Sequence, residues 1–231
     1  MALPVYLAMT AAEMGESTKL PSHFAYMACH FSPYGTGLSN LPKWLPENCM
    51  LTLNDRTPIC GHDPALIAEE LTKVIERRHC SSLLLDFQRP DCEEIAILAR
   101  ALIDALPCPV GLSAGYAKGF SCPVFLPPVP LDTPLASYLA PWQGREIWLE
   151  AALDGLQITL TSQGCKFSPI PYPSFSDGFM EETLYCHYQI QTGADFAEFT
   201  LYRTREDLNS LLEEAEILGV TSAIGLWQEL N

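Results

Sequence analysis

Short apolar runs recur along the chain and alternate with longer segments in which apolar residues return every three or four positions. Most of the short runs are continuously apolar, as expected for parallel strands that are covered on both faces. The predicted strands lie at residues 4–10, 23–31, 49–55, 81–87, 109–115, 123–127, 146–153, 198–204 and 222–228.

Three of the longer segments have the periodicity and the end signals of amphipathic helices. A helix usually begins after a side chain that caps its free N–H groups, and it ends at glycine or before proline. The start and stop signals are, in order, Asp63 followed by Pro64, Asp91 with Pro107, and the Thr204 and Asp207 pair with Gly219.

This alternation over residues 1–231 predicts a single (β/α)8 TIM-type barrel in the α/β class, compact and without some of its outer helices. Residues 154–203 depart from the pattern, because they alternate apolar and polar with a turn at Gly164 and an antiparallel partner at residues 184–192. We expect a small β-rich insertion there, not a separate domain. A doubly wound open sheet is the alternative, but no glycine-rich phosphate loop supports it.

The charge balance narrows the possible partners. The chain has 28 acidic and 13 basic residues and a net charge of -15, and its basic residues are scattered, so nucleic acid and anionic membranes are unsuitable partners. Residues 1–16 lack the basic region of a signal peptide, and no apolar run approaches the roughly 18 residues of a membrane span. We therefore expect a cytoplasmic protein, and the oligomeric state stays open.

The nine cysteines include no CxxC pair and no Cys/His group at zinc spacing. Most lie in or beside apolar runs, so we expect reduced core residues with no metal and no cofactor. Serine hydrolase, nucleotide-binding and zinc-protease signatures are absent as well.

The run at 81–87 follows a helix and ends in Asp86-Phe87-Gln88, and the last helix leads through ILGVTSAIGLWQEL to Trp227. This combination resembles the chitinase-like barrels of glycoside hydrolase family 18, especially their compact bacterial, spore-associated members. Residues 145–155 and 195–227 resemble the strand before the family's insertion and its closing unit. The resemblance implies a TIM barrel with a D-x-x-D-x-D-x-E signature on the fourth strand, an α+β insertion after the seventh strand, and a tryptophan at the sugar-binding floor.

The chain departs from that signature at the residues that perform catalysis. Its four acids fall on Ser81, Leu84, Asp86 and Gln88, so one of the four is retained. In the family's reaction the substrate's acetamido carbonyl attacks the anomeric carbon, the Asp orients it, and the Glu protonates the departing oxygen. An amide has no proton to give near neutral pH, and a general acid contributes about 10²- to 10⁴-fold. Gln88 therefore predicts impaired or absent hydrolysis.

The candidate catalytic residues are Asp86, Gln88 and Glu150. Glu150 lies within a strand, where a carboxylate is costly unless it is paired or hydrated. Asp86 and Gln88 could instead stabilise the turn after the strand, and Glu150 could instead face outward under the insertion.

The candidate substrate-binding residues each lie near a strand end, and they are Asp55, Tyr116, Trp227 and His30. The two aromatic rings could stack on sugar faces. The structural alternatives are a turn for Asp55, core packing for Trp227 and a structural role for His30, which lies close to Tyr34. No role is assigned to His62, His79 or His187.

Three functions are compatible with these residues. The first is a chitinase-like barrel that binds an N-acetylglucosamine-type glycan through Asp86, Gln88 and Trp227 without efficient hydrolysis. The second is an active glycosidase whose acid is Glu150 or Asp55, facing Asp86. The third is an interaction scaffold that binds no sugar and assembles through residues 154–203.

Overall fold

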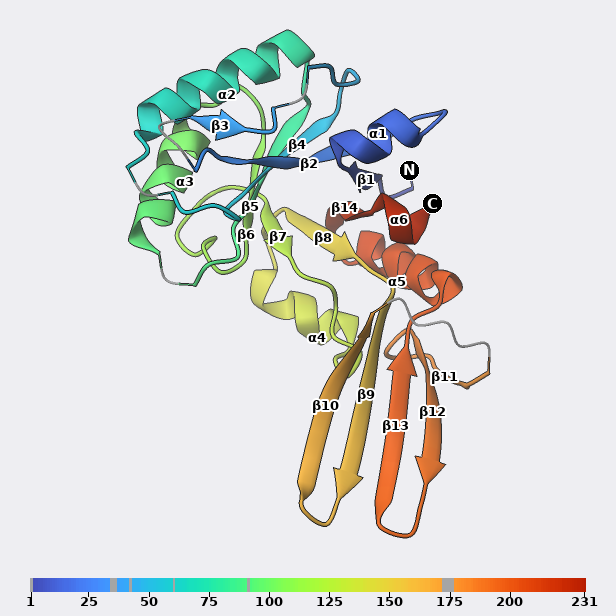
Figure 1. Cartoon of the computed structure of the whole chain (residues 1–231). Coiled ribbons are helices and arrows are strands. Elements are labelled where there is room, and N and C mark those ends of the chain that lie inside the picture. The colour runs from blue at the N-terminus through green and yellow to red at the C-terminus, as the bar shows by residue number, and fades with distance from the viewer. Residues whose placement is uncertain (1, 34–36, 42, 60, 91, 172–176) are drawn as a thin grey trace.

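The computed structural model describes residues 2–33, 37–41, 43–59, 61–90, 92–171 and 177–231. Its main part is a closed ring of eight parallel strands, in which β2 pairs with β1 and completes the circle (Figure 1). The predicted TIM-type barrel is therefore confirmed. In ring order the strands are β1 (Val5–Met9), β14 (Val220–Leu226), β8 (Ile147–Ala151), β7 (Val124–Leu126), β6 (Val110–Ser113), β5 (Ser82–Asp86), β4 (Met50–Asn54) and β2 (Phe24–Phe31).

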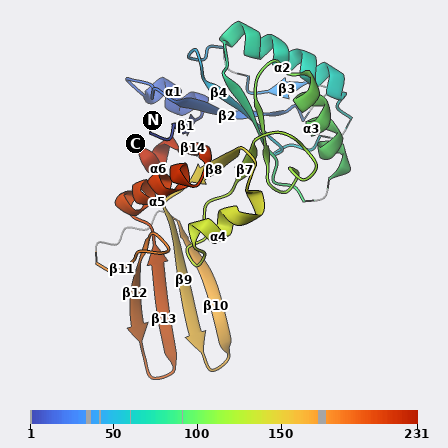
Figure 2. The same ribbon diagram turned by 180° about the vertical axis from the view of Figure 1, so that it is seen from behind.

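Helices cover only part of the ring. The longer ones, α2 and α3, follow β4 and β5 and lie side by side (Figures 1 and 2). Residues 114–123, between β6 and β7, contain no helix, in agreement with the expected loss of some outer helices. The remaining elements of the barrel part are α1 (Ala11–Glu16), β3 (Leu38–Ser39), α2 (Pro64–Arg78), α3 (Glu93–Ala105), α4 (Leu135–Leu139), the 3-10 turn Ala140–Trp142, α5 (Arg205–Ile217) and α6 (Trp227–Leu230). None of the helices among the described residues is both long and apolar enough to cross a membrane.

Most of the predicted helix ends are observed. The Asp63 carboxylate accepts from the Ala65 N–H at 2.9 Å at the start of α2. At α5, the Thr204 and Asp207 side chains each cap the other's main chain. The N-cap position of α3 belongs to Cys92, whose side chain makes no capping bond, and Asp91 lies outside the described residues.

The insertion lies between β8 and β14, the seventh and eighth strands of the ring, as predicted. It is an antiparallel sheet with the strand order β10-β9-β13-β12-β11, and the described part of 154–203 contains no helix. Figures 1 and 2 show that it projects away from the barrel beside α4 and α5. The strand predicted at 198–204 belongs to this sheet as β13 and is not part of the ring. The strands are β9 (Asp154–Thr161), β10 (Gly164–Pro171), β11 (Phe179–Glu181), β12 (Cys186–Thr192) and β13 (Phe196–Tyr202).

A buried arginine fixes the base of the insertion. Arg203, directly after β13, donates from Nη1 to the Val129 carbonyl at 2.8 Å and from Nε to the Tyr185 carbonyl at 3.1 Å. Nη2 donates to the Leu184 carbonyl at 3.4 Å. Because Val129 belongs to the loop after β7, this guanidinium joins the insertion to the barrel.

The inside of the ring is a packed core and not an open channel. Seven strands each contribute one buried side chain to a single cluster, and Trp148 covers Gly111 of the remaining strand, β6. The cluster consists of Ala8, Ala25, Met50, Leu84, Phe125, Trp148 and Ile224. Functional side chains must therefore lie above this layer, at the carboxyl ends of the strands.

The eight described cysteines are free, and five of them are buried. Cys165, on β10, is exposed and departs from the expected core position, and Cys60 lies outside the described residues.

Candidate functional site

The alternation of side chains along a strand places two of the predicted acids at one end of the barrel. Asp86 lies two residues after Leu84, and Glu150 lies two residues after Trp148, so both acids point to the same inner side as these core residues. Both are partly buried. Glu150 therefore faces the barrel mouth and not the outer surface.

Gln88 lies one further step toward solvent and is exposed. Its Nε2 donates to Asp86 Oδ1 at 2.5 Å. The amide thus contacts the one retained acid of the strand, and the pair stands at the rim of the mouth.

The turn that carries Gln88 is held from two sides. Asp55, which is buried, accepts the Gln88 N–H on Oδ1 at 3.0 Å and the Arg89 N–H on Oδ2 at 2.8 Å. Ser113 accepts the Phe87 N–H at 2.9 Å and donates to the Leu85 carbonyl at 3.1 Å. Asp55 therefore positions Gln88 and Arg89 through their main-chain N–H groups.

Two adjoining pockets open at this rim, and both are lined by Gln88, Arg89 and Pro90. One pocket, of about 340 Å³, is also lined by Glu150 and Tyr116. The other, of about 620 Å³, contains Asp86, Asp55 and His30 among its lining residues. The structure thus brings six of the seven predicted site residues into the lining of these two pockets. These are Asp55, Asp86, Gln88, Glu150, Tyr116 and His30.

The two acids differ in their electrostatic surroundings. Burial raises the pKa of Glu150 to about 7, and the negative charges of Asp86, Asp154 and Glu229 add to this rise. Burial and the charge of Asp55 raise the pKa of Asp86, while hydrogen bonds from Gln88 and Ser113 oppose that rise. No side chain among the described residues donates a hydrogen bond to the Glu150 carboxyl group. Glu150 can therefore hold or release a proton near neutral pH.

Tyr116 supports the turn with its hydroxyl group. This group donates to the Arg89 carbonyl and accepts from the Cys92 N–H at 3.1 Å. The ring packs edge-on against Phe87. Tyr116 therefore fixes one wall of the pocket that contains Glu150.

His30 lies in a network of polar contacts at the end of β2. Its Nδ1 lies 2.8 Å from the Phe31 carbonyl oxygen and 3.1 Å from Thr57 Oγ1, and its Nε2 lies 3.2 Å from Asn40 Nδ2. The neutral tautomer with a proton on Nδ1 satisfies both ring nitrogens. Tyr34 lies outside the described residues.

Trp227 is the predicted site residue that lies elsewhere. It begins α6 and lines a hollow with residues 16–22 and Asn231. Its side chain also packs against the main hydrophobic core. Neither of the pockets that contain Gln88 includes it.

The lining residues that were not predicted from the sequence include Thr52, Ser113 and Arg89. Thr52 lies two residues after Met50, and Ser113 two residues after Gly111, so the alternation that places Asp86 and Glu150 also places them. That two-residue step is a signal present in the sequence. Arg89 follows Gln88 in the turn, where no such periodicity applies.

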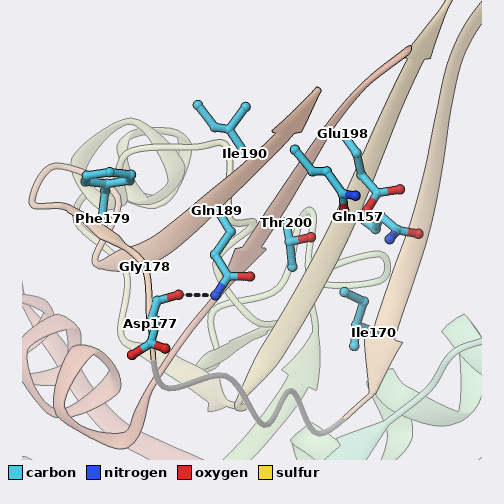
Figure 3. Close-up of a pocket in the computed structure, with 10 residues that line it drawn as sticks. Gln157, Ile170, Asp177, Gly178, Phe179, Gln189, Ile190, Glu198 and Thr200 are labelled. Carbon is cyan, nitrogen blue, oxygen red and sulfur yellow. Dashed lines mark hydrogen bonds between the residues drawn. The ribbon is translucent and has the colours of Figure 1, made fainter. Parts of the chain in front are cut away.

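A separate hollow of about 640 Å³ lies on the insertion. Figure 3 shows the Gln189 amide, which donates to the Asp177 carbonyl, beside Thr200 and Gln157. None of the predicted site residues, Asp86 and Glu150 included, lines this hollow.

Comparisons with known proteins yield matches in structure alone. No family model and no curated protein matches the sequence. The Bacillus cereus spore cortex-lytic enzyme SleL matches with a TM-score of 0.60 and 10% identity, covering 97% of this chain and 70% of that chain. The C-terminal domain of a putative chitinase from Desulfitobacterium hafniense matches with a TM-score of 0.60 and 8% identity, over 98% and 94%. A chitinase from Chromobacterium violaceum matches with a TM-score of 0.56 and 9% identity, over 97% and 93%. Because the sequence identities are 10% or lower, these matches show a shared barrel fold.

Proposed function

We propose that this chain is a chitinase-like barrel that binds an N-acetylglucosamine-type glycan at its mouth and hydrolyses it poorly or not at all. One observation carries the proposal: the exposed Gln88 amide, at the position where the family's proton donor is expected, contacts Asp86 at the rim of two pockets. The fold shared with a spore cortex-lytic enzyme and with chitinases supports the glycan as ligand class.

The chemistry of this pair favours binding over cleavage. Asp86 can accept a hydrogen bond from a substrate N–H or O–H, and the Gln88 carbonyl oxygen can accept one from a hydroxyl group. Protonation of the departing oxygen needs an acid, and an amide supplies none. A bound glycan would thus be held at the mouth without its leaving group being activated.

Calorimetric titration with N-acetylglucosamine oligomers, together with a turnover assay, tests this function. We expect saturable binding without appreciable turnover by the unaltered protein. Asp86→Asn should weaken binding, whereas Asp195→Asn, at the far end of the insertion, should not. Gln88→Glu should raise turnover by about 10²- to 10⁴-fold, because it restores a proton donor.

Two results would contradict the proposal. One is the absence of binding to oligomers of any length. The other is efficient hydrolysis by the unaltered protein that persists in Gln88→Ala.

A second candidate function, an active glycosidase, is favoured by Glu150. This acid lines the same pocket as Gln88, and burial together with the charge of Asp86 raises its pKa to about 7. A carboxylic acid with such a pKa can act as a general acid near neutral pH. In this case Glu150 donates the proton and Asp86 stays ionised.

The two functions differ in what Glu150→Gln does. If Glu150 is the acid, the unaltered protein turns over substrate, and the rate falls as pH rises above about 7. In that case Glu150→Gln lowers the turnover rate by at least about 10²-fold. If the site only binds, Glu150→Gln leaves the negligible rate unchanged and retains oligomer binding.

A further inference from the structure

The strand pairing in the insertion places apolar side chains in rows on one side of the sheet. Residues paired across antiparallel strands point to the same face, and neighbours along a strand point to opposite faces. The first row runs Pro169, Leu156, Leu201, Tyr188 and Phe179, the second Phe167, Ile158, Phe199 and Ile190, and the third Cys165, Leu160, Ala197 and Thr192. We call these residues the apolar face, and none of them is charged.

The opposite face is polar in its middle rows, whereas its end rows include Phe196 and Ile170. It carries Gln157, Thr200 and Gln189 in one row and Thr159, Glu198 and Gln191 in the next. Figure 3 shows Gln189 and Ile190, adjacent on β12, pointing to different sides of the strand. The sheet therefore has the two-sided pattern of a layer that packs against another layer on one side.

Much of the apolar face is open to solvent. Phe167 is 60% exposed, Phe179 67% and Ile190 51%. Next to the barrel, Cys186 contacts the Leu131 carbonyl, but the sheet projects away from that contact (Figures 1 and 2). No helix among the described residues of 154–203 covers the sheet.

We propose that the apolar face binds the apolar face of a second copy of this chain, so that two insertion sheets pack face to face. The dimensions suit this partner. Four strands are seven or eight residues long. At about 3.4 Å per residue and about 4.8 Å between strands, the footprint is about 450 Å² per copy. Two copies then bury about 900 Å² or more, close to the roughly 1,000 Å² at which specific interfaces begin.

The charge of the chain restricts where two copies can meet. With a net charge of -15, two copies repel each other across most of their surfaces. The apolar face is uncharged, so contact through it places no carboxylates opposite one another. The two rows nearer the barrel carry large residues, such as Phe167 and Phe199, and the row next to the hairpin tips includes smaller ones, such as Ala197 and Cys165.

Light scattering after size exclusion, over a series of protein concentrations, tests the proposal with matched variants. We expect the unaltered protein to approach twice its 25.6 kDa mass. Phe167→Glu should give the monomer mass, whereas Ser168→Glu, which adds the same charge to the other face of β10, should not. Ile190→Glu and Gln191→Glu form a second pair on β12. Because Phe167 and Ile190 are largely exposed, neither substitution disturbs the core, and circular dichroism checks the folding of each variant.

The alkylation rate of Cys165 gives an independent reading. Its thiol is exposed in the single chain and lies on the apolar face, so its modification, followed by peptide mass spectrometry, should slow as the dimer forms. Phe167→Glu should remove this protection.

Several outcomes would overturn the dimer. They are a monomer mass at every concentration, equal loss of mass in both members of a pair, and protection of Cys165 that appears only when N-acetylglucosamine oligomers are added. Asp86→Asn should leave the mass unchanged, so failure of the proposed glycan function at the mouth is distinguished from failure of this interface.

Discussion

The indole ring of Trp148 lies so close to Gly111 that a Cβ atom on residue 111 would stand 2.3 Å from the ring's Cζ3 atom. The two residues belong to β8 and β6, which are separated in the ring by β7. The tryptophan therefore reaches across the inside of the barrel and forms part of the layer beneath Asp86 and Glu150.

Gly111→Ala is expected to lower the free energy of unfolding by about 1–3 kcal/mol, because the added methyl group forces the Trp148 ring out of its position. Urea denaturation measures this change. Gly115→Ala is the matched control, since a Cβ at residue 115 meets nothing within 4 Å. Equal stability of the two variants would contradict the packing described for the barrel interior.

Glu150→Gln should stabilise the protein at high pH and not at low pH. Burial raises the pKa of Glu150 from 4.5 to about 7, so the folded state binds this proton more tightly than the unfolded state. The resulting cost of ionisation is absent below pH 4.5 and grows until the pH passes about 7. At about 1.4 kcal/mol per pKa unit, the variant should gain about 3 kcal/mol at alkaline pH.

Denaturation of both proteins across the pH range, with Glu213→Gln on the exposed side of α5 as the control, measures the effect. A stability difference that stays constant with pH would show that Glu150 is ordinarily solvated.

Asp55→Ala should loosen the turn that carries Gln88. Its carboxylate accepts two main-chain N–H groups, and their loss should cost about 2–4 kcal/mol of unfolding free energy. Asp55→Asn keeps one acceptor oxygen and should lose about half as much. Asp132→Ala, at an exposed position, controls for removal of an aspartate. If Asp55→Ala matches that control in stability and in amide exchange at residues 88 and 89, the proposed support of the turn is wrong.

Arg203→Met should destabilise the protein by about 3 kcal/mol or more, because three carbonyl groups lose a buried donor. Arg203→Lys should recover part of the loss, since an ammonium group cannot reach all three acceptors in the planar arrangement of a guanidinium. Thermal unfolding measures both variants. A fully stable Arg203→Met protein would show that the insertion needs no such tie to the barrel.

The barrel was predictable because its strands are short, continuously apolar and separated by helical periodicity. The insertion was predictable as well, because alternation of polar and apolar residues begins at residue 154. Strand periodicity also predicts that the side chains of Asp86 and Glu150 point inward, once the core residues two positions before them are known. The contacts of Asp55 were not predictable, since its two partners follow it by 33 and 34 positions and meet it only through the parallel pairing of β4 and β5.

Trp227 marks another limit of the sequence. Its place after the eighth strand suggests a position at the mouth, yet its side chain turns toward α1 and the residues that follow it, because α6 begins at Trp227 itself. A change of direction within one residue leaves no periodic signal. The start of α3 illustrates the same limit, because the sequence favours Asp91 as its N-cap and the structure has Cys92 at that position.

The buried guanidinium of Arg203 decides how the insertion can be transferred between proteins. One of its three acceptors, the Val129 carbonyl, lies outside the inserted segment, on the loop that follows the sixth strand. A chimera that grafts residues 154–203 onto another barrel would leave the Nη1 group of Arg203 without its acceptor unless residues 127–131 are transferred with it. A transfer that keeps this contact must therefore include both segments, residues 127–131 and 154–203.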